Sequence, residues 1–333
     1  MKGSNVSIFI PHNGCPHKCS FCDQRSITGQ NVQPSISDVE KTISIAIDSL
    51  KDKSKISEIA FFGGSFTAIN RKYMIELLDT ANKYVKEKIF KGIRISTRPD
   101  AIDDEILTIL KEKGVTSIEL GAQSMDENVL LLNSRGHSPQ DVINASNLIK
   151  SYGFSLGLQM MTGLYGSNYD IDYSTGLKLA ILKPDTVRIY PTIIMKNTEL
   201  QKLYESNIYK PMDFDECVDL CSNLILLFDK FDIPVIRFGL HNSKSLRENM
   251  VAGCYHPAFR EICESRILFN NCLSILKDMD DKNVIIYVNP STISKMIGHK
   301  RENINKLNKL GYSVKIKPNK NIERNSIRIE ISG

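Results

Sequence analysis

Three of the eight cysteines, Cys15, Cys19 and Cys22, lie within eight residues of one another near the start of the chain. They stand in a polar loop that is a poor setting for buried core cysteines, in the stretch PHNGCPHKCSFCDQ. A structural zinc site needs four protein ligands, and only His12 or His17 could supply the fourth. Three cysteines suit a [4Fe–4S] cluster in which one iron lacks a cysteine ligand and is open to a substrate or cofactor. We therefore expect a cluster here, with zinc as the alternative.

Other residues that could do chemistry stand where predicted strands end. Gly63, Gly64 and Ser65 end one strand, Arg98 follows the next, and Gln123 follows a third. Functional groups of parallel α/β folds gather at the carboxyl ends of the strands. We therefore expect these groups and the cysteine loop to face one cleft.

Short apolar runs alternate with amphipathic stretches over the first 240 residues. Strands are predicted at 6–10, 57–64, 92–97, 116–121, 154–161, 185–191 and 233–239, and helices at 37–50, 71–89, 103–114 and 138–153. Repeated βα units predict a parallel sheet with helices outside it, in a barrel or a doubly wound fold. The following stretch, 246–276, has the pattern of a helical connector.

The net charge of +5 is unevenly distributed. Residues 283–333 hold ten lysines and arginines against three acids, so this segment carries +7 and the rest of the chain −2. Such segregation favours a polyanionic partner. No apolar run is long enough to span a bilayer and no signal-peptide pattern opens the sequence, so we expect a cytoplasmic protein with no membrane partner.

The basic segment has the pattern strand, short helix, tight turn, helix, strand, strand. Its turn, Gly298, His299, Lys300 and Arg301, resembles the GXXG loop with which KH domains clamp a nucleic-acid backbone, with Arg301 in place of the second glycine. The likeness implies that these four residues bind RNA. A protein contact and a purely structural cap are the alternatives.

The cysteine spacing, with Phe21 just before the third cysteine, resembles the signature of the radical S-adenosylmethionine (SAM) superfamily. The resemblance implies that the open iron binds SAM, and that the reduced cluster cleaves it to a 5′-deoxyadenosyl radical that attacks the substrate. FFGGS resembles the superfamily's glycine stretch beside the methionine amino group. An electron donor such as flavodoxin or ferredoxin is implied as well.

Further motifs narrow the resemblance. FFGGSFTAI, ISTRPDAID, GVTSIELGAQSMDENVL, SRGHS, LGLQMMTGLYGS, RIYPTIIMKNTEL and YHPAFREI are similar to the catalytic subunit of Elongator, which modifies tRNA uridine, over roughly residues 5–270. That subunit spaces its first two cysteines more widely and continues into an acetyltransferase domain. Here the basic module follows instead, so the carboxymethylation reaction is not carried over.

The resemblance also implies which residues contact SAM. The expected set comprises Phe21, Gly63, Gly64, Ser65, Arg98, Glu119, Gln123, Gln159 and Tyr190. For Glu119 the alternative is an ion pair with Arg94, Arg98 or Arg188, because an unpaired buried carboxylate is costly. For Arg98 the alternative is likewise a structural ion pair. Cys217 and Cys221 are interpreted as core residues, while His256 is left open between a helix start and a site residue.

Together these patterns predict an α/β protein. The expected domains are a partial (βα)6-type radical-SAM barrel (1–240), a helical connector (241–282) and a small α+β KH-like module (283–333). The expected function is radical modification of a nucleobase in RNA, in tRNA or else rRNA. A radical enzyme acting on a small molecule such as a porphyrinogen, and a non-catalytic iron–sulfur RNA-binding protein, are the alternatives.

Overall fold

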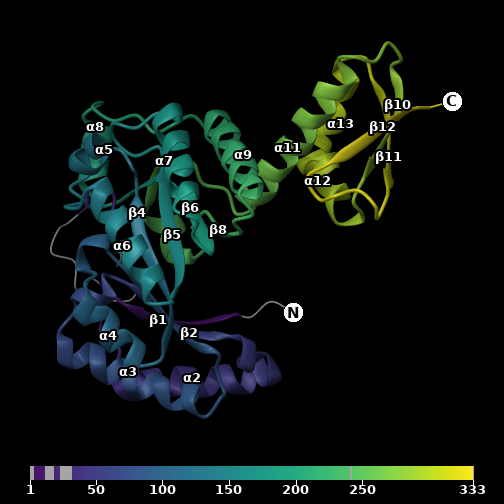
Figure 1. The fold of residues 1–333 in the computed structure, drawn as a ribbon. Helices are drawn as coiled ribbons and strands as arrows, with labels where there is room; N and C mark the ends of the chain where they lie inside the picture. Colours follow the sequence, from purple (N-terminus) through teal and green to yellow (C-terminus); the bar gives the residue numbers. More distant parts are fainter. Residues whose placement is uncertain (1–3, 12–18, 23–31, 241, 333) are drawn as a thin grey trace. The chain divides into compact units, whose positions relative to one another are not determined.

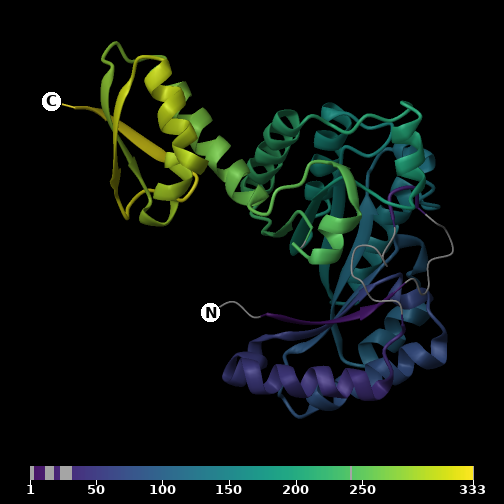
Figure 2. The same ribbon diagram turned by 180° about the vertical axis from the view of Figure 1, so that it is seen from behind.

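The computed structural model describes residues 4–11, 19–22, 32–240 and 242–332. Cys15, one of the three predicted cluster ligands, lies outside these ranges, as do His12 and His17. The chain divides into two compact units, Met1–Met212 with Leu227–Cys254 and Asp213–Leu226 with Tyr255–Gly333. Each unit has its own sheet (Figures 1 and 2). The three domain limits expected from the sequence stay predictions.

The first unit is built on a seven-stranded sheet whose strands follow one another in chain order. These are β1 (Asn5–Ile10), β2 (Glu58–Gly63), β3 (Gly92–Thr97), β4 (Val115–Gln123), β5 (Ser155–Thr162), β6 (Thr186–Pro191) and β8 (Val235–Phe238). All neighbouring pairs are parallel. An order without reversal distinguishes an open half-barrel from a doubly wound sheet. The predicted α/β partial barrel is confirmed, and all seven strands lie where the sequence predicts them.

Helices connect the strands. They are α2 (Ile36–Leu50), α3 (Arg71–Lys86), α4 (Asp104–Glu112), α5 (Glu127–Leu132), α6 (Pro139–Ser151), α7 (Tyr169–Ile181), α8 (Glu199–Glu205) and α10 (Lys244–Asn249), while α9 (Phe214–Lys230) runs through the division between the units. Short 3-10 turns cover Lys51–Ile56, Phe66–Ala68 and Pro99–Ala101. Local capping explains where helices begin: Ser35 and Ser138 each form a capping box with the acid three residues later.

The two faces of the sheet differ in chemistry. One face is apolar and buried, and α3, α4, α6 and α7 pack against its strands; its residues include Ile59, Phe61, Ile93, Ile95, Ile118, Leu120, Leu156, Leu158, Val187 and Ile189. The alternate positions, which point to the opposite face, carry Arg94, Ser96, Glu119, Gln159, Arg188 and Tyr190. A half-barrel thus presents a polar inner face to whatever it encloses.

One short stretch differs from the sequence prediction. Residues Met250–Gly253 lie inside the stretch expected to be helical, yet they form β9, which pairs antiparallel with β7 (Ile193–Met195). Gly253 has φ +112°, and a Cβ there would lie 2.7 Å from the Thr192 carbonyl oxygen. The close approach of β7 therefore needs a glycine at this point, and a helix cannot pass through it.

The second unit holds the basic segment. Its strands are β10 (Asn283–Val288), β11 (Ser313–Pro318) and β12 (Ile327–Ile331), with β10 in the middle, parallel to β11 and antiparallel to β12. Its helices are α11 (Phe259–Leu276), α12 (Ile293–Ile297) and α13 (Glu302–Lys309), with 3-10 turns at Pro290–Thr292 and His299–Arg301. The order of elements is as predicted, whereas the likeness to KH domains stays a prediction.

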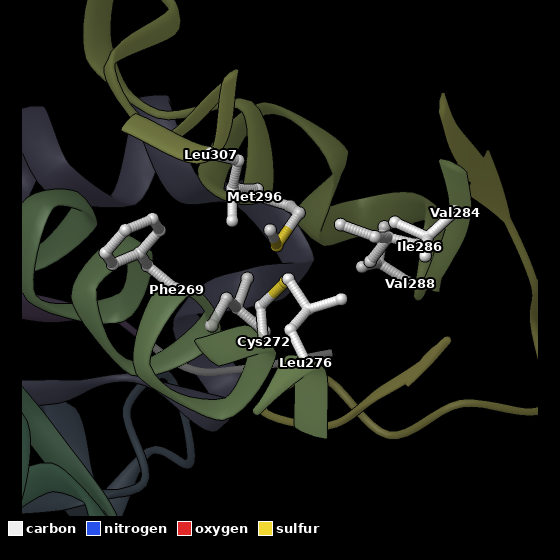
Figure 3. Packing of buried hydrophobic residues seen from close by; sticks show 9 residues of the cluster. Phe269, Cys272, Leu276, Val284, Ile286, Val288, Met296 and Leu307 are labelled. Carbon is white, nitrogen blue, oxygen red and sulfur yellow. The ribbon is translucent and has the colours of Figure 1, made fainter. Parts of the chain in front are cut away.

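The core of this unit lies between its helices and one sheet face. Figure 3 shows side chains of α11, α12 and α13 packed against those of β10, namely Phe269, Cys272, Leu276, Val284, Ile286, Val288, Met296 and Leu307. Cys272 is fully buried among them, and this burial raises the pKa of its thiol to about 12. Cys217, Cys221 and Cys263 are buried as well. Within the described residues, no helix is long and apolar enough to cross a membrane.

Candidate active site at the ends of the parallel strands

The described part of the cysteine loop is held by backbone and side-chain bonds. The Cys22 amide donates to the Cys19 carbonyl at 3.1 Å, which makes a tight turn over residues 19–22. Between them, the Ser20 amide and hydroxyl both donate to Asn133, at 3.2 Å to its carbonyl and 2.7 Å to its Oδ1. The Leu200 amide donates to the Ser20 carbonyl at 2.8 Å. The turn is therefore fixed between the C-terminal end of α5 and the start of α8.

Phe21 has an apolar environment. Its ring packs against the cluster of Ile194, Leu200 and Tyr209. This packing orients the two cysteines on either side of it, so the aromatic residue has a structural reason to stand there. Its predicted contact with SAM stays a prediction.

The glycine stretch joins the ends of three strands. Gly63 has φ +127°, and a Cβ at this position would collide with the Ile10 carbonyl at the end of β1. The next amide, that of Gly64, donates to the same carbonyl at 3.0 Å. The Ser65 hydroxyl is hydrogen-bonded to that of Thr97 at 2.8 Å and accepts the Arg98 amide at 3.2 Å. The predicted residues Gly63, Gly64, Ser65 and Arg98 are thus brought together.

Arg98 forms an ion pair, but one of its donor nitrogens has no partner among the described residues. Its Nε and Nη2 donate to the two carboxylate oxygens of Asp100, each at 2.9 Å. Its Nη1 is buried and has no hydrogen-bond partner in the described part of the chain. A buried donor without a partner costs about 1–3 kcal/mol. Arg98 therefore has one hydrogen bond still to give to a bound molecule.

Glu119 lies at the centre of a ladder of ion pairs on the inner face. Its Oε1 accepts from Arg94 Nη1 at 3.0 Å and from Arg188 Nη2 at 2.9 Å, and its Oε2 lies 2.8 Å from Arg188 Nε in an ion pair that is not aligned as a hydrogen bond. Arg94 also donates its Nε to Glu58 at 2.8 Å. Of the three arginines that were possible ion-pair partners for Glu119, the structure selects Arg94 and Arg188. The predicted contact of Glu119 with SAM stays a prediction.

The ladder also sets ionisation states. Burial raises the pKa of the Glu58 carboxyl, but hydrogen bonds from Ser117, Arg94 and Thr116 together with the Arg94 charge outweigh it, so the pKa is lowered. Burial alone would lower the pKa of Arg188, yet the Glu119 charge and Tyr190 raise it. The network is therefore a set of charged groups that pair with one another.

Gln123, Gln159 and Tyr190 line the same inner face. The register of β4 and β5 slips between Gly121 and Gln123, and Gln123 has φ +66°. Such irregularities re-aim a side chain, and here Gln159 Nε2 donates to Gln123 Oε1 at 3.3 Å. The three predicted residues thus belong to one surface together with the Glu119 ladder.

Two residues of the site, Arg135 and His137, were not singled out as site residues by the sequence. Arg135 Nη2 donates to the Gly121 carbonyl at 2.6 Å, while Nη1 donates to Cys19 Sγ at 3.3 Å. His137 Nε2 lies 3.1 Å from the Ala122 carbonyl, so it carries the proton, and the buried Nδ1 has no partner in the described chain. The signal that could have found them is the motif SRGHS, which holds both residues and is among those that resemble the Elongator subunit; in the structure each of the two is only 7% exposed.

Sequence comparison decides the family of this half-barrel. Residues 9–172 match the radical SAM superfamily and residues 184–268 match the Radical_SAM C-terminal domain. The chain belongs to the radical SAM superfamily. Its cofactors are therefore the [4Fe–4S] cluster and SAM, as predicted from the cysteine spacing.

Similar proteins are found in archaea of the genus Methanocaldococcus. The chain is 30% identical over 223 residues to an uncharacterized protein of Methanocaldococcus jannaschii, covering 64% of this chain and 68% of the relative. It is 25% identical over 258 residues to the tRNA uridine(34) acetyltransferase of the same organism, covering 65% of this chain but only 47% of that enzyme. A solved structure, the Methanocaldococcus infernus Elp3 with an N-terminal deletion, has a TM-score of 0.63 and 21% identity, covering 80% of this chain and 63% of that one.

The radical SAM cofactors fit the residues that are described. The Cys19 sulfur already accepts a hydrogen bond from a guanidinium, as a thiolate ligand of a cluster would. Buried donors or acceptors without partners remain at Arg98 Nη1, Arg135 Nε and His137 Nδ1. All three belong to residues at the carboxyl ends of the strands or to loops bonded to those ends, where a polar cofactor is expected. Gly298–Arg301 belong to the other compact unit.

The glycine stretch generates a first prediction. Gly63→Ala should lower the free energy of unfolding by about 2–4 kcal/mol, because Ala is strained at this φ and its Cβ meets the rigid backbone of β1. The matched control is Gly153→Ala, where φ is also positive at +81° but nothing lies within 4 Å of the added Cβ. That variant should lose only about 1–2 kcal/mol. Urea unfolding of both measures the difference, and equal losses would contradict the close approach.

The buried histidine generates a second prediction. Burial and the Arg135 charge lower the pKa of His137 to about 4, from 6.5 in the unfolded chain. The unfolded state therefore binds more protons between these values, so stability is complete above pH 6.5 and is lost as the pH falls toward 4. Parent protein should lose about 2 kcal/mol more than His137→Gln between pH 7 and pH 5. Urea unfolding at both pH values checks this, and parallel losses would show that His137 is protonated in the folded state.

Proposed function

We propose that this chain is a radical SAM enzyme that modifies a nucleobase in RNA, with tRNA as the favoured substrate and rRNA as the second. The reaction would be initiated by a 5′-deoxyadenosyl radical in the half-barrel, and the basic module would hold the RNA backbone. Electrons would come from a donor such as flavodoxin or ferredoxin. We place the reaction in the cytoplasm, where the cysteines of the chain would stay reduced.

The half-barrel supports the catalytic part of the proposal. Cys15, Cys19 and Cys22 would hold the cluster, and the backbone of Gly63 and Gly64 would lie beside the methionine portion of SAM. Arg98 has a buried donor to offer, while Gln123, Gln159 and Tyr190 would line the space for the cofactor. When bound, the reduced cluster supplies the electron that cleaves SAM. The chain's own residues orient the cofactor and shield it from water.

The loop of the basic module carries the proposal for RNA. Gly298 has φ +82°, and Lys300 and Arg301 follow with φ of 48° and 65°, although neither is a glycine. Left-handed backbone costs a non-glycine residue roughly 1–2 kcal/mol. Strain of this kind persists where the surrounding structure enforces it, often at ligand-binding positions. The three side chains that it presents, His299, Lys300 and Arg301, are all exposed.

The helix that follows this loop has an unusual start. Arg301 occupies the N-cap position of α13 (Glu302–Lys309) and makes no side-chain capping bond. An N-cap is usually Ser, Thr, Asp or Asn, whose oxygen accepts from the first amides. A cation near the positive end of the helix dipole is unfavourable on its own. A phosphate at this helix start would pair with Arg301 and Lys300 and offset the unfavourable charge.

A buried asparagine fixes the loop. Asn303 Nδ2 donates to the Met296 carbonyl at 3.1 Å, the Lys295 carbonyl at 3.2 Å and Ser265 Oγ at 2.9 Å. These bonds tie the first turn of α13 to the end of α12 and to α11. A Cβ on Gly298 would lie 2.9 Å from the Asn303 amide nitrogen, so the turn needs a glycine there. The loop is therefore presented to a ligand in one conformation.

The third prediction tests the function itself. Anaerobically reconstituted protein should cleave SAM to 5′-deoxyadenosine, and bulk tRNA should stimulate this cleavage whereas a porphyrinogen should not. Cys19→Ala should lose cluster iron and cleavage. Mass spectrometry measures the nucleoside product, and nucleosides of total tRNA and rRNA from a deletion strain should lack one modification. Stimulation by a porphyrinogen alone would favour the small-molecule enzyme. RNA binding with no cleavage at all would favour the non-catalytic alternative.

The fourth prediction tests the division of labour. Changing His299, Lys300 and Arg301 together to Gln should weaken RNA binding by about 1–3 kcal/mol and reduce the salt slope by about one per cation removed. Cleavage of SAM without RNA should be unchanged, because the changed residues belong to the other compact unit. Filter binding at several salt concentrations measures both quantities.

The matched control removes the same charge elsewhere in the module. Lys315→Gln with Lys317→Gln deletes two exposed cations of β11, as the loop variant deletes two cations beside His299. This control should lose less affinity than the loop variant. Equal losses would mean that the module attracts RNA by general charge, and parent affinity in the loop variant would make the loop a structural or protein-docking element.

A further inference from the structure

Arg135 differs from the buried arginines Arg94 and Arg98 in its hydrogen-bond partners, which are a sulfur and a carbonyl and not carboxylates. It lies in the loop between α5 and α6, and its side chain contacts the Cys19 sulfur through Nη1 at 3.3 Å. Nη2 donates to the Gly121 carbonyl at 2.6 Å, and Nε is buried with no partner among the described residues. The guanidinium therefore bridges a predicted cluster ligand and the end of β4.

The charge of Arg135 lacks a carboxylate partner in the described chain. Arg94 pairs with Glu58 and Glu119, Arg188 with Glu119, and Arg98 with Asp100. A guanidinium cannot give up its proton, and burying it without a negative partner costs several kcal/mol. The negative group that could offset it at this position is the sulfur that it already contacts. A cluster-bound cysteine is a thiolate, so cluster binding would provide the missing charge.

The contact is fixed from both sides of the loop. Asn133, two residues before Arg135, accepts two hydrogen bonds from Ser20, the neighbour of Cys19. Its own Nδ2 donates to the Val129 and Tyr165 carbonyls, each at 2.8 Å. On the other side, His137 is bonded to the Ala122 carbonyl. Arg135 thus reaches Cys19 from a loop that is bonded both to the cysteine turn and to β4.

We propose that Arg135 donates to the cluster-bound thiolate of Cys19 and raises the reduction potential of the cluster. One-electron reduction adds a negative charge to the cluster, so a fixed cation beside a ligand sulfur stabilises the reduced form more than the oxidised form. Hydrogen bonds to cluster sulfurs and net charge are the means by which proteins set such potentials. Arg135 would thereby make the cluster reducible by its electron donor. The inference rests on the cluster, and it is independent of whether RNA is the substrate.

The test is a redox titration of the reconstituted holoprotein, followed by electron paramagnetic resonance of the reduced cluster. Arg135→Gln keeps a donor but removes the charge, and at a fixed donor potential the ratio of reduced to oxidised cluster should fall about tenfold, or 59 mV for one electron. Arg135→Lys keeps the charge and should retain most of the parent's potential. Lys150→Gln is the matched control: it removes one exposed cation of the neighbouring α6, whose side chain donates to the Leu182 carbonyl and not to Cys19, and it should match the parent.

Each outcome of the titration either supports or overturns the proposal. A variant with Gln at position 135 that keeps the parent's potential overturns the proposal, as does a Lys150→Gln variant that shifts as far, because general charge and not the contact with Cys19 would then matter. If the Gln variant holds no iron, the Lys variant decides. Full iron with a potential near the parent's supports a role for the charge. A Lys variant that folds by circular dichroism but holds no iron overturns it. Stimulation of SAM cleavage by RNA, measured separately in the parent, tests the proposed function and leaves this result unaffected.

Discussion

The half-barrel depends on keeping Glu119 charged and paired inside it. This carboxylate lies on β4, in the middle of the sheet, and bonds to Arg94 on β3 and Arg188 on β6. Removing one member of such a buried pair costs about 3–5 kcal/mol, because it strands the others without a partner. Replacing the whole set with apolar side chains would be tolerated for stability. We infer that the charges are kept for what the inner face binds.

The same constraint explains why the strands end as they do. Every buried polar group needs a partner, and at the carboxyl ends the sheet no longer supplies them. Loops from elsewhere in the chain do so instead: the Gly64 amide bonds to the end of β1, and Arg135 and His137 bond to successive residues of β4. Where these loops leave a donor or an acceptor without a partner among the described residues, the atom is a candidate contact for a ligand.

Much of the fold and the chemical class were predictable from the sequence, because both depend on local patterns. Strands appear as apolar runs, and the cysteine spacing identifies a cluster loop without reference to any distant residue. The glycine at position 63 signals a close approach. The sequence does not reveal that the approaching atom is the Ile10 carbonyl, because that requires the pairing of β1 with β2.

The parts that could not be predicted are those that depend on long-range contacts. Three arginines were equally good partners for Glu119 in the sequence, and only the register of the sheet selects Arg94 and Arg188. Arg98 pairs instead with Asp100, which is only two residues away in the sequence. Arg135 is 116 residues from Cys19, so no spacing rule could connect them. Strand β9 was missed because a segment of four residues is too short for its hydrophobic periodicity to distinguish a strand from a helix.

Under the proposed function, the two compact units would meet different physical demands, and their residues suit this division. Phosphate contacts fix the position of a nucleic acid but carry little sequence information, so a rigid loop with exposed cations is sufficient for that task. Choosing a base requires directed hydrogen bonds in a place without water, and paired charges, amides and a phenol on the inner face can provide them. Because a radical would react with any nearby C–H bond, an enzyme with the proposed function would have to choose the base before the cofactor is cleaved. Under that proposal, specificity would belong in the half-barrel beside the cofactor, and the basic module would contribute affinity.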